Sequence, residues 1–286
     1  MQKLKDNYLE NNDGKAPKTP AVAGQILVKG DGSGTMDEKK TTVYRSATAI
    51  CMYIMQWSRP DIYNATRGQA RQMAAPREAH GKALQTLMRY VVATKNRGLV
   101  LSPDTLWDGS KKFKFKTHGR SDSDYAGNTD DRRSISGGRV FVNNAPVSFR
   151  SNTQKTVTLS VTEAEGVAGV MVAQDMLYVY RLLQSLGLEV ELPMILEMDN
   201  KGAVDLANNW SVGGRTHHVD VRNYFLRELK DMGLIQCRYV PGPENDADIF
   251  TKNVTSAIFE KHIPKYVGVD EYTKEWADAQ RLDTSE

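Results

Sequence analysis

Cysteine is scarce in this sequence: a chain of 286 residues has two, Cys51 and Cys237. They lie far apart and neither belongs to a Cys-x-x-Cys pair, which argues against a disulfide framework and a zinc knuckle. Isolated thiols of this kind are typical of reduced proteins of the cytosol or nucleus. With 40% hydrophobic residues, the chain has the composition of a globular protein that buries an ordinary core.

Long apolar runs are also missing. The sequence has no stretch of about 18 apolar residues, so it predicts no membrane span. Residues 1–18 are polar and charged and lack the apolar segment of a secretory signal. We therefore expect a protein that is not secreted and does not act at a membrane.

The chain has no large excess of charge of one sign, and its formal net charge is +3. This value alone does not indicate a nucleic-acid partner, and local basic clusters are either solvated faces or phosphate contacts. The clustered basic residues are Lys111, Lys112, Lys114, Lys116, Arg132 and Arg133.

The pattern of residues predicts three regions. Residues 1–40 are rich in Gly and Pro and are expected to form a flexible or irregular arm. Residues 41–106 have helical periodicity, with three helices that begin near Tyr44, Pro60 and Pro76. Residues 107–286 are expected to form a second, α/β domain.

In the second domain the hydrophobic period changes from that of helices to that of strands. Strands are predicted first and are followed by a helix, a strand, two helices, a strand and a helical tail, which indicates a mixed sheet with helices packed on it. Ser160 and Glu163 indicate a capping box at the start of the long helix. The predicted segments are strands at 112–118, 138–149 (two strands around a turn at Asn143-Asn144), 155–159, 194–198 and 235–240, and helices at 162–186, 200–209, 219–231 and from 245.

Four carboxylates lie at strand ends and helix starts: Asp122, Glu165, Asp199 and Asp248. Such positions gather at one edge of an α/β sheet. Carboxylates brought together stay ionised only with cations among them, and two Mg²⁺ ions about 4 Å apart can activate water against a phosphodiester. The alternative is structural, because acids at helix starts also favour the helix dipole and cap amides.

Several longer sequence motifs around these acids resemble motifs of the ribonuclease H domain of copia-type retrotransposons. Their order and spacing agree over residues 110–260. The motifs are Ser121 to Gly127, Asp131 to Gly137, Leu159 to Glu165, Asp199-Asn200 with Ala203, Arg215 to Arg222 and Ala247 to Lys252.

The first half resembles the stretch that follows the polymerase palm in copia-type reverse transcriptases. The matching words are Tyr44-Arg45-Ser46 and Ser58 to Ile62, with Pro76 and His80 beyond. The paired-Asp word of the polymerase is absent from this sequence, so we do not expect this chain to polymerise DNA by itself.

The resemblance implies an RNase H-like mixed five-stranded sheet flanked by helices, preceded by a small helical thumb- or connection-like region. It implies that Asp122, Glu165, Asp199 and Asp248 are catalytic residues that bind two Mg²⁺ ions, with Mn²⁺ as the alternative. The implied reaction is hydrolysis of the RNA strand of an RNA–DNA hybrid, recognised through its 2′-hydroxyls and phosphates. The polymerase part of the same polyprotein is the implied partner, in the cytoplasm within a virus-like particle or in the nucleus.

Further side chains are candidates for contacts with the substrate. Many ribonucleases H have a histidine just before the last Asp, and residues 239–245 contain none. His217 or His218 is a candidate substitute, and a structural role for either is the alternative. Gly166 stands where the family usually has a bulky aromatic. The substrate-contact candidates are Arg132, Arg133, Ser134, Ser160, Thr162, Asn200, Arg215, His217 and His218.

Two other functions compete with the nuclease. The first is a catalytically silent module that binds hybrids or serves as a scaffold, which the missing loop histidine and Gly166 leave open. The second is a DNA-cutting enzyme such as an integrase core, against which the words at Asp199-Asn200 and Ala247-Asp248 argue.

Overall fold

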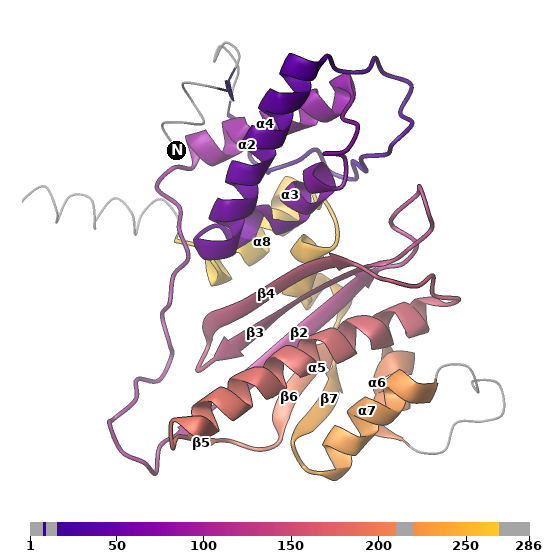
Figure 1. Ribbon diagram of the computed structural model, residues 1–286. Coiled ribbons are helices and arrows are strands. Elements are labelled where there is room, and N and C mark those ends of the chain that lie inside the picture. Colours follow the sequence, from indigo (N-terminus) through magenta and orange to yellow (C-terminus); the bar gives the residue numbers. More distant parts are fainter. Residues whose placement is uncertain (1–7, 10–15, 210–219, 269–286) are drawn as a thin grey trace, which may run out of the picture. The chain divides into compact units, whose positions relative to one another are not determined.

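The computed structural model describes residues 8–9, 16–209 and 220–268 (Figure 1). The chain forms two compact units. One combines Met1–Val100 with Asn253–Glu286, and the other is Leu101–Lys252. Each unit has its own secondary structure and its own buried core.

The first unit is helical, and the three helices predicted in its sequence are present. They are α2 (Glu38–Trp57), α3 (Tyr63–Ala70) and α4 (Glu78–Ala93). The Asp37 side chain caps α2 by accepting a hydrogen bond from the Lys40 N–H, which satisfies a donor that the first turn leaves unpaired. The short 3₁₀ helix η1 (Pro60–Ile62) leads into α3 and has proline in its first turn, where the missing N–H costs nothing.

A buried ion pair holds the helices of this unit together. Arg59 is fully buried and donates to both carboxylate oxygens of Asp61, at 2.8 and 2.6 Å. The Tyr90 hydroxyl of α4 donates to the same carboxylate at 2.7 Å. A buried charge is stable only when paired in this way, so η1 and α4 are fixed to one another.

The described tail of the chain, residues 253–268, belongs to this helical unit. The sequence placed it in the second domain, which was expected to run from 107 to 286. Instead Phe259 of α8 (Ser256–His262) packs edge-on against Tyr90, with ring centroids 5.9 Å apart. Val267 forms an antiparallel bridge with Leu99. The apolar side chains of the tail are thus buried against the helices.

The second unit is built on a five-stranded mixed sheet in the order β4-β3-β2-β6-β7. β2 pairs with β3 and β3 with β4 in antiparallel fashion, whereas β2, β6 and β7 are parallel. This is the mixed sheet flanked by helices that the sequence predicted. The strands are β2 (Thr117–Asp124), β3 (Ile135–Val142), β4 (Ala145–Thr153), β6 (Met194–Met198) and β7 (Ile235–Tyr239). A separate parallel pair joins β1 (Lys114–Phe115) to β5 (Glu189–Val190).

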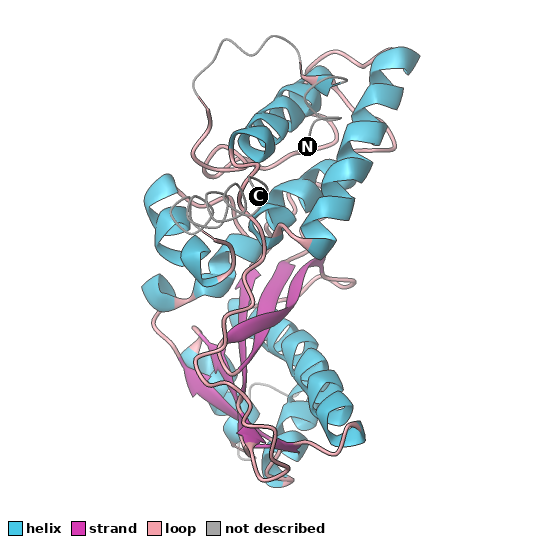
Figure 2. Cartoon of the chain, turned by 90° about the vertical axis from the view of Figure 1, so that its left-hand side faces the viewer, coloured by secondary structure: helices cyan, strands magenta, loops and turns pink. Residues whose placement is uncertain are grey.

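Helices cover one face of this sheet (Figures 1 and 2). The long helix α5 (Val161–Ser185) runs along the sheet, and α6 (Lys201–Asn208) and α7 (Asp220–Asp231) pack beside it. The hydrophobic core lies between them, and its buried side chains include Val172 and Met176 of α5 and Leu196 and Met198 of β6. Helix α5 comes close because β2 and β3 carry glycines there: a Cβ at Gly138 would lie 2.2 Å from Val172 Cγ2.

Most predicted elements of this unit are present, but the strand predicted at 112–118 is divided between β1 and the start of β2, and the strand predicted at 155–159 is absent. Asn143 and Asn144 form the turn between β3 and β4 with φ of 47° and 65°, a conformation that asparagine tolerates. Ser160 accepts from the Glu163 N–H at 3.1 Å, as the capping box predicted. Residues 155–159 form no strand, because the chain must leave edge strand β4 there to enter α5.

None of the helices in residues 16–209 and 220–268 combines the length and apolar character needed to cross a membrane.

Candidate metal centre

Asp122 and Asp199 reach the same edge of the sheet because their strands are parallel neighbours. Arg120 of β2 pairs with Glu197 of β6, and each Asp lies two residues further along the chain, Asp122 within β2 and Asp199 directly after the end of β6. Side chains two apart share a face of a strand, so the two carboxylates come side by side. Glu165, in the first turns of α5, completes the group: one ligand oxygen from each of the three acids lies within 4.8 Å of the others.

The two carboxylate oxygens of Glu165, the third acid of this group, differ in their contacts. One accepts hydrogen bonds, and the other has no hydrogen-bond partner. Asp122 and Glu165 are 1% and 3% exposed. Glu165 Oε1 accepts from the Ser123 N–H at 2.9 Å and from the Ser123 hydroxyl at 2.7 Å. Glu165 Oε2 is buried and has no hydrogen-bond partner. A buried carboxylate oxygen without a partner is unfavourable, and this one fits the oxygen-only coordination of a hard divalent cation.

The pKa shifts of these acids also indicate a position suited to a cation. Burial, and then the charges of Asp122 and Asp199, raise the pKa of Glu165 to about 9. Burial and the charge of Asp122 raise the pKa of Asp199 and bring that of Asp248 to about 7. These carboxylates repel one another in a dry site, so added positive charge would stabilise the fully ionised form.

Asp248 lies beside Asp122 and is linked to it through a lysine. It belongs to the 3₁₀ helix η4 (Asp246–Phe250). The Lys252 ammonium donates to Asp248 Oδ1 at 3.1 Å and to Asp122 Oδ1 at 3.4 Å. The Thr251 hydroxyl also donates to Asp122. The sequence prediction named the four acids, and it missed Lys252 and Thr251, although both stand in the word Ala247 to Lys252 that carried part of the resemblance.

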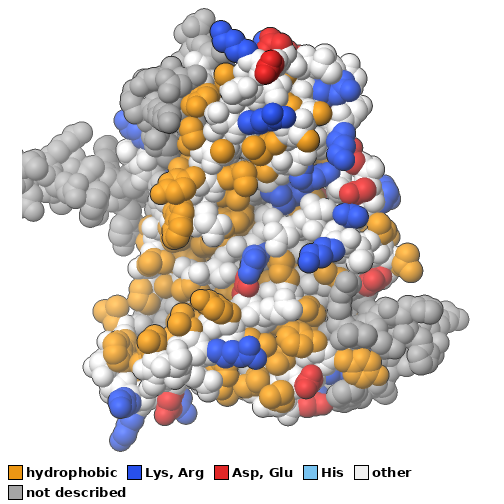
Figure 3. Space-filling model, in the orientation of Figure 1, with side chains coloured by type: hydrophobic (Ala, Val, Ile, Leu, Met, Phe, Trp, Pro, Cys, Tyr) orange, Lys and Arg blue, Asp and Glu red, His pale blue; other side chains and the backbone are white. Residues whose placement is uncertain are grey.

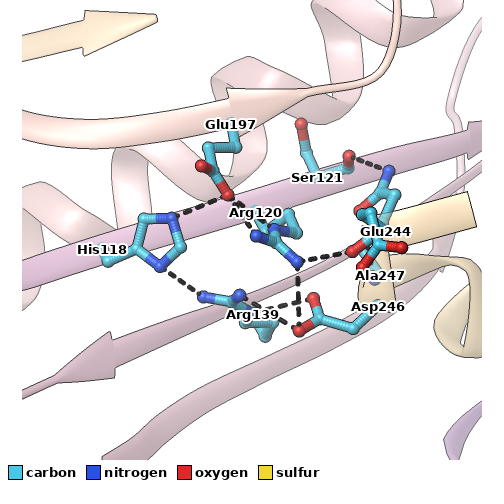
Figure 4. Close-up of polar contacts among 9 residues, drawn as sticks. His118, Arg120, Ser121, Arg139, Glu197, Glu244, Asp246 and Ala247 are labelled. Atoms are coloured by element: carbon cyan, nitrogen blue, oxygen red, sulfur yellow. Dashed lines mark hydrogen bonds and ion pairs between the residues drawn. The ribbon is translucent and has the colours of Figure 1, made fainter. Parts of the chain in front are cut away.

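A network of charged side chains fixes the strands just before the carboxylates (Figure 4). Arg120 donates to Glu197 and to the Glu244 carbonyl, and its guanidinium lies 3.3 Å from Asp246 Oδ2. Arg139 of β3 also pairs with Asp246, at 3.1 Å. Through these contacts the network ties β2 to β6 and ties both β2 and β3 to η4.

Glu197 is the acid at the centre of this network. Burial opposes its ionisation, but hydrogen bonds and charges from His118 and Arg120 prevail and lower its pKa to about 2. His118 Nε2 lies 3.0 Å from Glu197 Oε2. Burial lowers the pKa of His118 itself. Glu197 is therefore an ionised anchor for β6 directly before Asp199.

The substrate-contact candidates between β2 and β3 lie in different surroundings. Arg132 and Arg133 are exposed, and Arg133 is 3.7 Å from Asp131. Ser134 is fully buried and its hydroxyl accepts from the Ala126 N–H and pairs with Thr158. Only the two arginines are thus open to solvent.

The candidates near α5 and α6 hold helix starts. Ser160 caps α5, and Asn200 caps α6 by accepting from the Ala203 N–H at 2.9 Å. The Thr162 hydroxyl is 3.5 Å from Asn200 Oδ1. Arg215, His217 and His218 lie outside the described residues.

Basic side chains are dispersed over the face shown in Figure 3. On the described part of that face, Lys and Arg stand singly or in small groups among hydrophobic and uncharged atoms. This agrees with the low net charge, so the centre of carboxylates is the more specific signal of function.

Comparison with known proteins gives the family. No family model matches the chain. It is 32% identical over 266 residues to the retrovirus-related Pol polyprotein from transposon TNT 1-94 of Nicotiana tabacum, a match that covers 91% of this chain. It is 31% identical over 228 residues, 80% of this chain, to that from transposon RE1 of Arabidopsis thaliana. The chain spans 19% and 15% of the lengths of these two polyproteins.

A solved structure gives a weaker likeness, to the LC11 ribonuclease H1 isolated from compost. Its TM-score is 0.38 at 16% identity, over 52% of this chain and 98% of that one.

The mixed five-stranded sheet and its buried acidic centre define an α/β protein with a candidate metal site. By these matches the chain belongs to the copia-type retrotransposon Pol polyproteins, and it corresponds in length to a small part of each relative.

Proposed function

We propose that the unit Leu101–Lys252 is a metal-dependent ribonuclease H that hydrolyses the RNA strand of RNA–DNA hybrids during retrotransposon reverse transcription. One observation carries the proposal: Asp122, Glu165 and Asp199 converge from three separate elements, with ligand oxygens within 4.8 Å. Acids that only cap helices or close turns have no reason to converge in this way. All three are among the four acids for which the resemblance implied catalysis.

Asp122, Glu165 and Asp199 would hold one Mg²⁺ or Mn²⁺ ion, and Asp122 with Asp248 would hold a second. When bound, such ions supply an activated water and neutralise charge on the phosphodiester. The chain orients these ligands: Ser123 fixes one oxygen of Glu165. Asn245 donates to the Ser121 carbonyl at 3.0 Å and so ties η4 to β2. Burial keeps bulk water from Asp122 and Glu165.

The proposed substrate is an RNA–DNA hybrid, read by shape, 2′-hydroxyls and phosphates. Arg132 and Arg133, exposed near the end of β2, are suited to phosphate contacts. Thr162 and Asn200, at the helix starts beside the acids, are proposed to orient the RNA backbone. The roles of Arg215, His217 and His218 remain those expected from the sequence. Because the relatives are polyproteins, the polymerase part of the same polyprotein is the proposed partner, within a cytoplasmic virus-like particle or the nucleus.

The test is cleavage of an end-labelled RNA–DNA hybrid by the full chain with Mg²⁺ and with Mn²⁺. We expect the RNA strand to be cut and EDTA to stop the reaction. Asp199→Asn should lower the rate by about a hundredfold or more, because the centre loses a charged ligand. The matched control is Asp205→Asn, at an exposed position of α6, which should cleave as the parent does. Equal rates in Asp199→Asn and the parent would contradict the assignment.

A catalytically silent hybrid-binding module is the second candidate. It is favoured by the loop 239–245, which has no histidine, and by the Lys252 ammonium bound to two of the four acids. Its distinguishing result is hybrid binding that weakens with salt but gives no cleavage with either metal.

A further inference from the structure

Lys252 is the cation of the acidic centre. Its ammonium lies 3.4 Å from Asp122 and 3.1 Å from Asp248. No hydrogen bond joins it to Glu165 or Asp199 among the described contacts. The ammonium thus contacts only the Asp122–Asp248 side of the centre, and it acts on Asp199 through its charge alone, which partly offsets the rise in the Asp199 pKa.

On the opposite side of the centre, a carboxylate oxygen of Glu165 has no hydrogen-bond partner. Glu165 is almost fully buried, and its Oε2 has no hydrogen-bond partner. Asp122 belongs to both sides, since it meets Glu165 and Asp199 on one and Lys252 on the other. The centre therefore has one half that needs a cation and one half that already has one.

The position of the Lys252 side chain allows its ammonium to move away from Asp122 and Asp248. Its backbone is fixed, because the Lys252 N–H donates to the Asp248 carbonyl at 2.9 Å. Its side chain is 40% exposed and consists of a flexible stem with a strongly hydrated ammonium. A rotation of the stem exchanges the two carboxylates for water, while Asp122 and Asp248 stay where the fold holds them.

We propose that Lys252 is a built-in cation that reserves the Asp122–Asp248 position, so that this centre takes one divalent ion readily and a second only when the lysine moves away. This inference rests on the proposed metal centre. A divalent ion in contact with both Asp122 and Asp248, at about 2.1 Å from each oxygen, would overlap the ammonium. The first ion binds to Asp122, Glu165 and Asp199, and binding of the second is linked to release of Lys252.

The test counts bound Mn²⁺ in the full chain without nucleic acid, by electron paramagnetic resonance of free Mn²⁺ and by calorimetry. The parent should bind one ion with a second that is much weaker. Lys252→Met should tighten the second ion by about tenfold or more, equal to about 1.4 kcal/mol. Lys252→Arg keeps the charge and should behave as the parent does. Lys155→Met, at an exposed lysine of the same unit, should change nothing.

The controls separate the two proposals. Circular dichroism establishes that each variant is folded, and Lys252→Gln provides a second neutral variant. If the first ion binds and is lost in Glu165→Gln, but Lys252→Met and Lys252→Gln have the parent's second affinity, only the role of Lys252 is overturned. If the parent binds no ion and Glu165→Gln changes nothing, the metal centre fails and the role of Lys252 fails with it.

Discussion

At the scale of single residues, the centre is a set of acids that are stable together only with added positive charge. Glu165 is the extreme case, with burial and two neighbouring carboxylates raising its pKa to about 9 from an ordinary 4.5. The sequence predicted that four acids would meet, and three of them, Asp122, Glu165 and Asp199, lie with ligand oxygens within 4.8 Å of one another. Their degree of burial, which sets the strength of this repulsion, was visible only in the folded chain.

This repulsion predicts how the stability of the metal-free protein depends on pH. Below pH 4.5 both folded and unfolded chains keep the Glu165 proton. As the pH rises toward 9 the unfolded chain ionises while the folded chain resists, so the free energy of unfolding falls. Thermal unfolding in EDTA should therefore show a falling midpoint between about pH 5 and pH 8.5, and Glu165→Gln should flatten the slope.

Divalent ions should reverse that loss. Binding to the native centre stabilises it by mass action, and the ionised acids bind best. We expect Mg²⁺ to raise the midpoint by several degrees near neutral pH and above, and by less in acid. An equal shift by Mg²⁺ in Glu165→Gln would contradict this reading of the centre.

At the scale of elements, the network around Glu197 joins β2 to β6 and so brings Asp122 beside Asp199. The folded-state pKa of Glu197 is about 2, below its ordinary 4.5. Its contribution to stability is therefore fully present above pH 4.5 and is lost as the pH falls through 2. This is the opposite direction to Glu165, so the two groups can be separated by titration.

Glu197→Gln keeps the shape of the side chain but removes the charge that pairs with Arg120 and His118. We expect a loss of about 2 kcal/mol at neutral pH, because the partly buried Arg120 guanidinium loses its counter-charge and the His118 ring loses a charged hydrogen-bond partner. Urea unfolding measures it, with Glu189→Gln at an exposed position of β5 as the matched control. A change below about 0.5 kcal/mol, the range of ordinary surface substitutions, would mean that the network does not hold the strands.

The close packing of α5 on the sheet depends on glycine at position 138 of β3. A Cβ at Gly138 would lie 2.2 Å from Val172 Cγ2 and 2.9 Å from the Arg120 carbonyl oxygen. Gly138→Ala should therefore cost about 1–3 kcal/mol through overpacking. Gly98→Ala, where a Cβ meets nothing within 4 Å, is the control for the same chemical change. Equal unfolding midpoints for the two variants would show that α5 can shift without cost.

At the scale of the whole molecule, the chain is not divided where its sequence suggested. The tail 253–268 follows the last acid of the centre in sequence but packs with the helices near the N-terminus. The helical unit therefore depends on residues from both ends of the described chain.

Phe259→Ala tests this division. Phe259 is 3% exposed and packs on Tyr90, so its removal should cost about 3–5 kcal/mol of local stability. Hydrogen exchange should speed up in α4 and leave β2 and β6 unchanged. Equal acceleration in the strands would show that the two units unfold as one.

The sequence by itself determined the local elements and the identity of the acids. The three helices, the turn at Asn143-Asn144, the cap at Ser160 and the strand before Asp199 follow from period, turn chemistry and capping, which act over a few residues. The strand predicted at 155–159 failed because its apolar residues lie where the chain must leave the sheet edge.

The tertiary structure decided which side chains share the centre and what each contacts. Each of these features depends on residues that are distant in sequence. They are the buried oxygen of Glu165 without a partner, the Lys252 ammonium between two acids, the network around Glu197, and the packing of Phe259 on Tyr90. Burial and pairing depend on what the rest of the chain packs against each group. No local pattern contains that information, and the same Lys252 would be an ordinary solvated lysine without β2 beside it.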